Sequence, residues 1–566
     1  MKVRYITEQS ELQELALFLR QPAIRLLGCD VETLGLNPRQ DKLRLLSLAY
    51  REDRAFVIDA FKTDITPLFP ILENKVLVFH NGLFDLQFLW MLGFRPGQVR
   101  DNMLMSQVRY AGRKTDEGKR LSHSLEAVVQ RELGITLPKS LQTSDWSGEL
   151  TQQQIEYAGR DAALLLPIDA KMRQKVETFG LGVAVDIEHR ALPSVVWMSV
   201  QGVSVWVSRW EELTQQRQGD VCFLEEVLCQ IIEEDLGSGR VVNWSSPKQI
   251  QKLFAELGDP LFSTTRSRLM ESNHRLAKTL LKYREVNKLT TTYGMKWIGK
   301  AVNGRIYIQW LQCPTATGRM AASTPNLQQV PRNKEYRECI CAPKGRKLIC
   351  ADLSQIEARI VAKLANEGRM IDIFQSGGDI HTETAKLILG KREITKDDRQ
   401  IAKSAVFALL YGAGAARFQM YAKTTYGIEM SLDEAKRIRE AFFKTYPKLG
   451  IWHRSHGDET INTRTLIGRW RCDVEKYTEK NNSPSQGSGA DMLKLALALM
   501  WERRNESGGY APIAAIHDEI LAEGPEETAE QAKEWVIRCM VDASAFMLWP
   551  CPTGVEAVIA QDWGSK

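Results

Sequence analysis

This sequence lacks three features that would assign it to a narrow class of proteins. Its ten cysteines include no C-x-x-C pair, which argues against a disulfide framework or a zinc site and fits a reducing compartment. No apolar run approaches the roughly 18 residues of a membrane helix, and the first residues contain no apolar signal-peptide core. We therefore expect a cytoplasmic protein that does not contact a membrane.

The chain also has little net charge. Its 75 Lys and Arg residues nearly balance its 70 Asp and Glu residues and leave a charge of +5. Any site for a polyanion must therefore come from a local cluster of basic residues. At 566 residues the chain is too long for one hydrophobic core, and we expect several domains that pack against one another.

Strand-like and helical segments alternate in residues 1–185, which predicts a compact α/β domain. The strand-like runs are residues 24–29, 43–50 and 76–79. Residues 190–300 are predicted to be mostly helical, and the rest of the chain mixes strands with helices and ends in a strand pair at 511–523. The expected fold class is therefore α/β and α+β in a multidomain chain.

A basic amphipathic helix is predicted before residue 300. Apolar side chains recur at steps of three and four from Leu276 to Tyr293, whereas Lys282 and Lys288 fall elsewhere on the helix. Residues 264–300 contain nine basic side chains and two acidic ones. Such a pattern usually indicates a helix face that is exposed to solvent. Because this helix precedes a catalytic region, we expect its basic face to bind the phosphates of a nucleic acid backbone.

Four acidic residues form the first candidate catalytic group. Asp30 and Glu32 end a strand-like run, and their i, i+2 spacing puts both side chains on one face. Asp85 and Asp161 add two carboxylates, and Tyr157 precedes Asp161 by one helical turn. Such acids suit a pair of Mg²⁺ ions that activate water for phosphodiester hydrolysis. An Asp-x-Glu pair alone would more simply be a solvated strand end.

The whole series of acids resembles the proofreading 3'-5' exonucleases of the ribonuclease H-like fold. The segment Ser144-Asp145-Trp146, which precedes Tyr157, strengthens that resemblance. The resemblance implies that the four carboxylates hold the metal ions and that Tyr157 orients the attacking water.

A second pair of acids is predicted in the later part of the chain. Asp352 follows an apolar strand at residues 347–351, and Asp518 occupies the tip of a predicted hairpin at residues 513–522. If these elements are neighbours in one sheet, both acids can share two metal ions roughly 3.5 to 4 Å apart. An acid in a hairpin tip is otherwise ordinary turn chemistry.

Arg399, Lys403, Phe407 and Tyr411 recur every four residues. We expect them to form one stripe over three turns of a helix that begins with a capping box at Thr395. A nucleoside triphosphate along this stripe would meet the cations with its phosphates and the aromatic rings with its sugar and base. A purely structural helix is the alternative for the stripe taken alone.

Over nearly its whole length the chain resembles family A DNA polymerases, the group that includes bacterial DNA polymerase I. The segments that carry the resemblance are residues 317–331 (TGRMAASTPNLQQVP), 352–359 (DLSQIEAR), 379–381 (DIH), the stripe from Arg399 to Tyr411, 486–491 (QGSGAD) and 517–519 (HDE). Residues 243–249 (NWSSPKQ) and 283–293 are similar to the family's thumb.

The resemblance implies a right-hand polymerase that follows a ribonuclease H-like exonuclease domain. The implied boundaries are 1–185 for the exonuclease domain, 186–310 for the thumb, 311–362 for the first part of the palm, 363–477 for the fingers and 478–566 for the second part of the palm. The implied activity is DNA-directed DNA synthesis at a primer 3' end by two-metal phosphoryl transfer, with 3'-5' proofreading.

The resemblance also implies roles for single residues. Asp352 and Asp518, with Glu519 secondary, would hold two Mg²⁺ ions, for which Mn²⁺ can substitute, and Lys403 would protonate the leaving pyrophosphate. The residues implied in nucleotide binding are Arg399, Lys403, Phe407, Tyr411, His381, Gln355 and Glu357, the last excluding a ribose 2'-hydroxyl. Those implied in DNA binding are Arg319, Asn326, Gln328, Gln486, His517, Lys282 and Lys288.

Three positions depart from the family pattern. Leu353 stands at a usual tyrosine, Trp470 interrupts an arginine-rich segment, and Thr478 replaces an arginine that contacts primer-template DNA. We expect neither a flap endonuclease domain nor a thioredoxin-binding thumb insertion. The expected partners are primer-template DNA, deoxynucleoside triphosphates and replisome accessory proteins, and the expected state is a monomer in a bacterial or phage-infected cell.

Two other functions remain open at this point. A ribonuclease D-type exonuclease with a helical RNA-binding appendage would have no use for the Arg399 stripe or for Asp518. A catalytically inactive DNA-binding scaffold predicts broken metal ligands. The six principal acids are nevertheless all present, namely Asp30, Glu32, Asp85, Asp161, Asp352 and Asp518.

Overall fold

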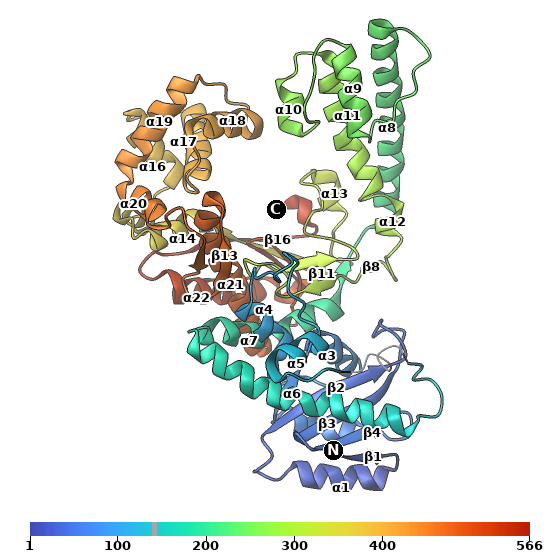
Figure 1. Ribbon diagram of the computed structural model, residues 1–566. Coiled ribbons are helices and arrows are strands. Elements are labelled where there is room, and N and C mark those ends of the chain that lie inside the picture. The colour runs from blue at the N-terminus through green and yellow to red at the C-terminus, as the bar shows by residue number, and fades with distance from the viewer. Residues whose placement is uncertain (138–143) are drawn as a thin grey trace.

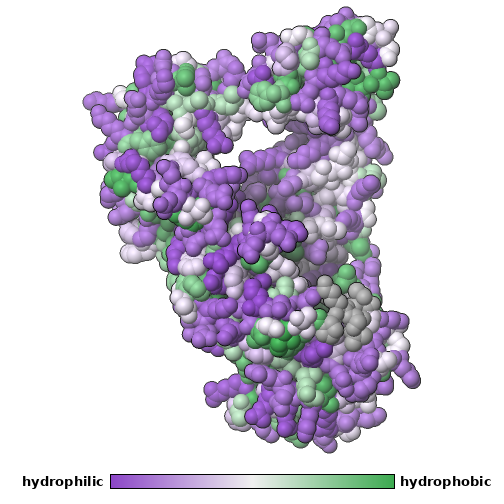
Figure 2. Space-filling model, viewed as in Figure 1, coloured by the Kyte–Doolittle hydropathy of each residue, from purple (hydrophilic) through white to green (hydrophobic). Residues whose placement is uncertain are grey.

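The computed structural model describes residues 1–137 and 144–566. The chain forms a lower lobe around a six-stranded sheet, a central region around a four-stranded sheet, and two helical upper lobes that face each other (Figure 1). Figure 2 shows a hollow between the upper lobes and the central region, bordered mainly by hydrophilic residues. No helix in the described residues combines the length and the apolar character needed to cross a membrane.

The sheet of the lower lobe has the strand order β1-β4-β3-β2-β5-β6. Its strands are β1 (Lys2–Ile6), β2 (Leu26–Thr33), β3 (Leu43–Arg51), β4 (Arg54–Asp59), β5 (Val76–Phe79) and β6 (Gln98–Asp101). The three strand-like runs predicted from the sequence are confirmed. However, β2 continues beyond its predicted end, because β3 pairs with it as far as Thr33. Asp30 and Glu32, expected at the end of the run, therefore lie within the strand.

Helices cover this sheet and lead out of the lobe. α6 (Gln152–Thr178) starts at a capping box between Thr151 and Gln154 and packs across β2, β3 and β4. The other helices of the lobe are α1 (Gln9–Leu19), α2 (Phe69–Leu72), α3 (Gly82–Met91), α4 (Asn102–Arg109) and α5 (Leu125–Leu133). α7 (Gly182–Gln201) packs against both α3 and α21 (Tyr477–Glu502), so it joins the lobe to the central region.

The central sheet is antiparallel throughout and has the order β14-β15-β11-β16. Its strands are β11 (Arg346–Ser354), β14 (Ala511–Ile516), β15 (Glu519–Pro525) and β16 (Gly554–Ala560). The predicted hairpin is confirmed, and it pairs with the strand of Asp352, which was the condition for a shared metal site. Smaller elements around the sheet are β7 (Val203–Ser204), β8 (Arg305–Ile306), β9 (Gln309–Leu311), β10 (Ala321–Ser323), α13 (Lys334–Glu338), β12 (Ile461–Arg464), β13 (Trp470–Val474) and α22 (Ala529–Leu548).

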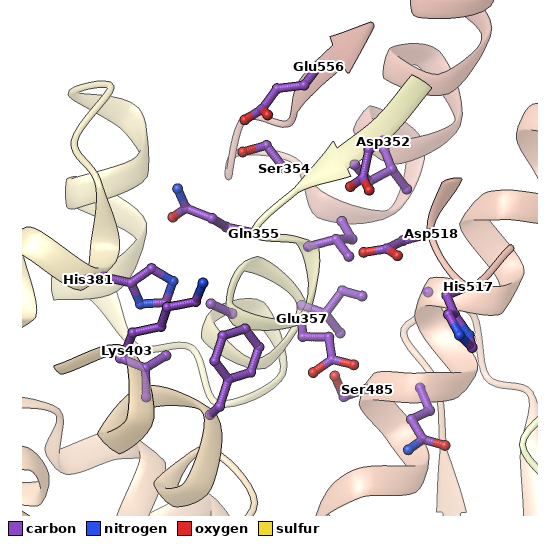
Figure 3. Close-up of a pocket in the computed structure, with 18 of the residues that line it drawn as sticks. Asp352, Ser354, Gln355, Glu357, His381, Lys403, Ser485, His517, Asp518 and Glu556 are labelled. Atoms are coloured by element: carbon purple, nitrogen blue, oxygen red, sulfur yellow. The ribbon is translucent and has the colours of Figure 1, made fainter. Parts of the chain in front are cut away.

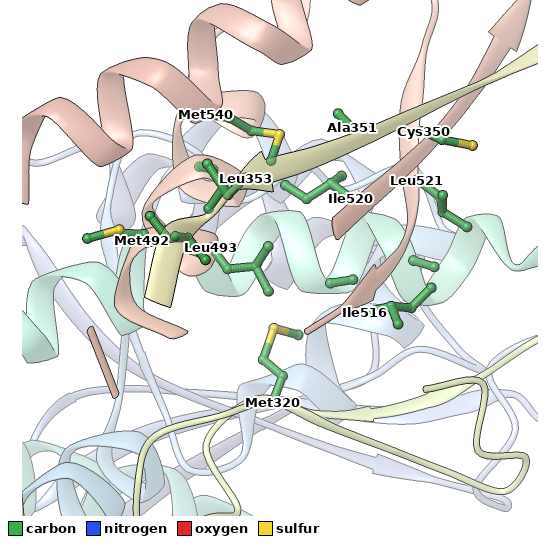
Figure 4. Close-up of a cluster of buried hydrophobic side chains, with 14 of the residues drawn as sticks. Met320, Cys350, Ala351, Leu353, Met492, Leu493, Ile516, Ile520, Leu521 and Met540 are labelled. Atoms are coloured by element: carbon green, nitrogen blue, oxygen red, sulfur yellow. The ribbon is translucent and has the colours of Figure 1, made fainter. Parts of the chain in front are cut away.

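Near the end of β11, alternating side chains point to an apolar core and to the cavity on the opposite face. Ala351 and Leu353 point into an apolar core, where they meet Ile520 from β15 and Met492 from α21 (Figure 4). Asp352 lies between them in sequence and points to the opposite face. The core position of Leu353, which is 2% exposed, explains why an aliphatic residue is stable there.

The two upper lobes are helical. One consists of α8 (Val207–Leu236), α9 (Pro247–Glu256), α10 (Arg266–Glu271), α11 (Arg275–Thr291) and α12 (Met295–Ile298). The other consists of α15 (Gly368–Gln375), α16 (Ile380–Leu389), α17 (Lys396–Leu409), α18 (Ala415–Tyr426), α19 (Leu432–Thr445) and α20 (Pro447–Ser455), and α14 (Ile356–Leu364), which packs mainly on α21, joins it to the central region. Helix α11 is the predicted amphipathic helix, because its apolar face is buried against α8.

Some of the basic residues around α11 bond within their own lobe and are not free to follow phosphates. Arg275 Nη2 lies 2.8 Å from Asp235 Oδ1, and Arg284 donates to the carbonyl oxygen of Thr264. Lys282 and Lys288 are exposed, so they remain candidates for DNA contact.

Strand β13 makes the junction between the central region and the lower lobe. The Cys472 N–H donates to the Ala111 carbonyl oxygen at 2.8 Å. The ring of Trp470 lies 5.2 Å from the ring of Phe179 in an edge-to-face arrangement. The tryptophan that departs from the family pattern is therefore part of a contact between two regions of the molecule.

A buried ion network connects α7 with α21 beside the start of β13. Arg469 Nε lies 2.6 Å from Asp491 Oδ1, and its Nη2 lies 2.6 Å from Glu188 Oε1. The Lys494 ammonium contacts the same Glu188 carboxylate. The four side chains are at most 1% exposed. Because Glu188 belongs to α7 and Asp491 to α21, the network holds the connecting helix against the central region.

Removing Arg469 leaves two buried carboxylates with a single ammonium group. We expect Arg469→Met to lower the free energy of unfolding by about 3 to 5 kcal/mol, as breaking a buried ion pair does. The measurement is the midpoint of thermal unfolding. Arg503→Met is the matched control, because it breaks an exposed pair with Asp542, where about 1 kcal/mol or less is expected. Equal midpoints in the two variants would contradict this expectation.

Candidate active sites

The structure brings four carboxylates together in the lower lobe. Asp30 and Glu32 share one face of β2, and Asp161 reaches them from α6. Asp85 lies in the first turn of α3, where its Oδ1 accepts a hydrogen bond from Val31 N at 3.0 Å. Asp30 consequently interacts electrostatically with each of the other three acids.

Burial raises the pKa of each of these acids, and repulsion within the group adds to this effect at Asp30 and Glu32. Burial, followed by the charges of its neighbours, raises the pKa of Asp30 well above its usual range and that of Glu32 to about 8. Burial raises the pKa of Asp85 to about 8 and that of Asp161 to about 6. Asp161 Oδ1 is also buried without a hydrogen-bond partner among the described residues. Carboxylates in this state fit divalent cations, which would neutralise them.

A glycine allows α6 to approach β2 closely enough to deliver Asp161. A Cβ atom on Gly28 would lie 2.1 Å from the Ala162 carbonyl oxygen, so a larger residue would push the helix away from the strand. On the same helix Tyr157 interacts with Asp161, and burial together with this carboxylate raises the pKa of Tyr157 above its usual value.

Asp101 is a buried acid near this group that the sequence reasoning missed. Its Oδ2 accepts a hydrogen bond from Gly82 N at 2.6 Å, and its Oδ1 accepts one from Leu104 N at 2.9 Å. Asp101 therefore holds the first turns of α3 and α4, and through α3 it positions Asp85. An acid between a strand and a helix is an N-cap pattern, which could have identified it.

A second group of charged residues lines a cavity of about 780 Å³ beside the central sheet. Figure 3 shows Lys403 and His381 on one side of this cavity and Asp352 and Asp518 on the other. The predicted residues that line it are Arg319, Asp352, Gln355, Glu357, His381, Arg399, Lys403, Phe407, Gln486, His517 and Asp518. Predicted residues outside this lining are Tyr411, Glu519, Asn326, Gln328, Lys282 and Lys288.

The backbone holds Asp352 and Asp518 side by side. Leu353 N donates to Asp518 O at 3.2 Å, and Asp352 pairs across the sheet with Glu519 on β15 and Glu556 on β16. Burial, followed by the charge of Asp518, raises the pKa of Asp352 to about 7, and burial also raises the pKa of Asp518. Two adjacent carboxylates in this state fit Mg²⁺, which binds hard oxygen donors.

Neither group of acids forms a complete cage for a metal ion. In the part of the chain that the structure describes, no three His, Cys, Asp or Glu side chains are grouped as a ready ligand set. Mg²⁺ is usually bound through one or two carboxylates, with water and substrate phosphates as the remaining ligands. The carboxylates present at both sites are compatible with that kind of coordination.

Helix α17 borders the cavity and starts at the predicted capping box between Thr395 and Asp398. Arg399 already has a partner, because its Nε and Nη2 lie 2.8 and 3.1 Å from the two carboxylate oxygens of Asp379. Although burial opposes it, hydrogen bonds from Arg399 and Thr382 lower the pKa of Asp379 to about 2. Arg399 is thus oriented by Asp379, a carboxylate to which the sequence reasoning gave no role.

His381 is uncharged near neutral pH. Burial lowers its pKa to about 4, and its Nδ1 is buried without a partner among the described residues. The centre of its ring lies 5.7 Å from the centre of the Phe407 ring, and both residues line the cavity. His381 can therefore offer a ligand a hydrogen bond but not a positive charge.

The prediction that Tyr411 lies on the same helix as Arg399 and Phe407 is wrong. α17 ends at Leu409, and Gly412 N bonds to Leu409 O in the turn that follows. Gly412 has φ of 77°, a left-handed conformation that ends the helix earlier than the four-residue spacing implies. Tyr411 therefore leaves the helix, and its hydroxyl donates to Glu357 Oε2 at 2.7 Å.

The residues predicted to bind DNA have different environments. Arg319 Nη2 lies 3.6 Å from Glu357 Oε1 at the cavity border. Gln328 Nε2 donates to Ala515 O at 3.0 Å, so this side chain braces β14. Asn326 Oδ1 is buried and has no hydrogen-bond partner in the described part of the chain.

Three charged residues of the cavity were not predicted, namely Arg332, Glu556 and Lys566. Glu556 lies opposite Asp352 on β16. Lys566 Nζ lies 2.8 Å from Glu519 Oε1 and 3.9 Å from Asp352 Oδ2. Glu519 Oε1 also accepts a hydrogen bond from Trp563 Nε1 at 3.0 Å. The sequence of this segment does not show that β16 lies beside β11, so these contacts had no signal in it.

Comparison with known proteins identifies two families in the chain. The family model for DNA polymerase family A matches residues 208–565, and that for 3'-5' exonuclease matches residues 3–177. The chain is 31% identical to a DNA polymerase I of Aquifex aeolicus over the full length of both proteins. It is 28% identical to DNA polymerase I of Pseudomonas aeruginosa, over 95% of this chain and 63% of that protein.

A similar solved structure is the POL domain of Pol1 from M. smegmatis in complex with DNA primer-template and dNTP. It has a TM-score of 0.84 and 22% sequence identity, and the match covers 100% of both chains. This likeness supports the fold. Polymerases and exonucleases of these families generally use divalent metal ions.

Metal binding by the lower-lobe acids should depend on the close approach of α6 to β2 at Gly28. We expect Gly28→Ala to weaken Mn²⁺ binding at least about tenfold, because the added Cβ moves α6 and Asp161 away from β2. Titration calorimetry in an Asp352→Ala background measures this, since the polymerase cavity is then impaired. Gly148→Ala is the control, because its Cβ would meet nothing within 4 Å. Equal Mn²⁺ affinity in the two variants would rule out this role for Gly28.

Proposed function

Since the chain belongs to DNA polymerase family A and carries a 3'-5' exonuclease domain, we propose that its two acid sites extend and shorten the same DNA primer strand. The observation that carries the proposal is the adjacency of Asp352 and Asp518 in a cavity that Lys403 and Phe407 also line. The proposed substrates are primer-template DNA and deoxynucleoside triphosphates, the ligands named for the similar mycobacterial structure.

In the polymerase cavity, the proposed reaction forms a bond from the primer 3' oxygen to the α-phosphorus and breaks the bond to pyrophosphate. Two Mg²⁺ ions held by Asp352 and Asp518 would supply the charge that stabilises the attacking and leaving oxygens. Lys403 borders the cavity, where its ammonium can give a proton to the leaving pyrophosphate. Arg399, oriented by Asp379, and neutral His381 would hydrogen-bond to triphosphate oxygens.

In the lower lobe, the proposed reaction is hydrolysis of the terminal phosphodiester of the primer. Asp30, Glu32, Asp85 and Asp161 would share Mg²⁺ ions whose charge activates the water and stabilises the leaving oxygen. Tyr157 lies beside Asp161, where its hydroxyl can orient the attacking water. The raised pKa values of the acids support this assignment, because buried like charges need a cation.

We further propose functional boundaries for the chain. Residues 1–185 would act as the exonuclease domain, residues 186–310 as the thumb and residues 363–477 as the fingers. Residues 311–362 and 478–566 would form the palm. The central sheet, whose strands come from both proposed palm segments, supports this division.

The two activities should be separable by substitution. We expect the double variant Asp30→Ala with Glu32→Ala to lose 3' degradation and retain primer extension, because these acids lie in a lobe of their own. Asp352→Ala should have the reverse effect and cost several kcal/mol of transition-state stabilisation, on the order of a thousandfold in rate. The measurement is the length of a labelled primer with and without deoxynucleotides. Loss of both activities in both variants would contradict the assignment of the two sites.

Glu357 is proposed to occlude the 2' position of the incoming sugar. Glu357→Ala should then raise incorporation of ribonucleotides relative to deoxynucleotides by on the order of tenfold or more. Tyr411→Phe is the matched control, because it removes the hydrogen bond to Glu357 but leaves the carboxylate in place. The readout is the ratio of the two incorporation efficiencies. An unchanged ratio in Glu357→Ala would exclude the role.

A further inference from the structure

A lysine side chain reaches into the carboxylate group of the polymerase cavity. Lys566 Nζ lies 2.8 Å from Glu519 Oε1 and 3.9 Å from Asp352 Oδ2. Glu519 is buried, with 5% of its side chain exposed, whereas 30% of the Lys566 side chain is exposed. In the part of the chain that the structure describes, these are the ion pairs made by Asp352 and Glu519.

The segment before Lys566 is anchored, so the position of the lysine is not that of a loose tail. Trp563 is 1% exposed, and its Nε1 donates to Glu519 Oε1 at 3.0 Å. Its backbone N–H donates to the Ile340 carbonyl oxygen at 2.9 Å. A Cβ on Gly564 would lie 2.7 Å from Glu338 Cγ, which shows how tightly this turn packs on α13. Figure 1 shows this end of the chain above β16.

The acids around the Lys566 ammonium need a cation. Asp352, Glu519 and Glu556 stand opposite one another on three adjacent strands, and Asp518 precedes Glu519 in the hairpin. Like charges this close repel one another, and the repulsion is least screened at Glu519, the buried member of the three. A buried carboxylate such as Glu519 is stable mainly when it is paired. The ammonium supplies part of that charge from within the chain.

We propose that Lys566 is a resident counter-ion of the polymerase carboxylates, which stabilises the metal-free site and competes with divalent cations for it. This inference rests on the proposed metal site at Asp352 and Asp518. An ammonium group and a divalent ion beside the same Asp352 carboxylate repel each other. Metal binding would therefore be coupled to withdrawal of the Lys566 side chain, whose exposure leaves it a path to solvent.

The coupling can be measured in full-length protein that carries Asp30→Ala and Glu32→Ala, so that metal binding in the lower lobe is suppressed. Binding of Mg²⁺ and Mn²⁺ is followed by calorimetry, and the midpoint of thermal unfolding is recorded in EDTA and in Mg²⁺. We expect Lys566→Met to bind metal about fivefold more tightly, at the lower end of typical coupling between sites. It should also unfold at a lower temperature in EDTA and gain more from Mg²⁺.

Two further variants test whether the change in metal affinity comes from the positive charge of Lys566 or from the loss of any lysine in this region. Lys566→Arg keeps the positive charge and should bind metal like the starting protein. Lys347→Met removes a lysine from the same sheet that pairs with Glu526 at 3.2 Å, and it should leave metal affinity unchanged.

The possible outcomes are distinct. An affinity of Lys566→Met within twofold of the starting protein would overturn the proposal. Weaker binding would also overturn it, because the ammonium would then orient Glu519 for the metal and not compete with it. Absence of any binding that depends on Asp352 in the starting protein would contradict the proposed metal site itself, and the counter-ion with it.

Discussion

The pairing of β11 with β15 and β16 is the constraint on which the polymerase cavity depends. It aligns Asp352 with Glu519 and Glu556 across three strands. A slip of one residue would turn Asp352 into the apolar core and bring Leu353 to the cavity, since side chains alternate between faces. The core shown in Figure 4 therefore selects the register, and the register sets the chemistry on the opposite face.

Both acid groups concentrate negative charge, but the protein compensates for this differently at each. In the lower lobe the carboxylates mainly face one another, and Arg160 approaches Asp161 only to 3.8 Å. In the polymerase cavity an ammonium group from Lys566 lies within 2.8 Å of Glu519. The cavity must also accept a polyanionic substrate, for which a lining that includes Lys403 and Arg399 is suited.

The sequence was informative where the signal was local. The i, i+2 spacing of Asp30 and Glu32 predicted their shared face, and the apolar run before Asp352 predicted its strand. Tertiary features had no such signal. The close approach at Gly28 depends on which helix crosses the strand, and the contact of Lys566 depends on the order of strands in the sheet. The glycine after Tyr411 indicated where that helix closes, but the four-residue spacing could not show that Tyr411 itself lies in the turn.

The ion network of Glu188, Arg469, Asp491 and Lys494 also affects how such a chain can change over evolutionary time. Replacing a complete buried ion network by apolar side chains can be neutral or even stabilising, whereas replacing one member strands a charge. The members lie on α7, on α21 and in the turn before β13, so no single mutational event replaces them together. Every stepwise route to an apolar version passes through a damaged intermediate. The network can therefore persist in a lineage because no single substitution replaces it without loss of stability. This holds even where the complete network contributes little to stability.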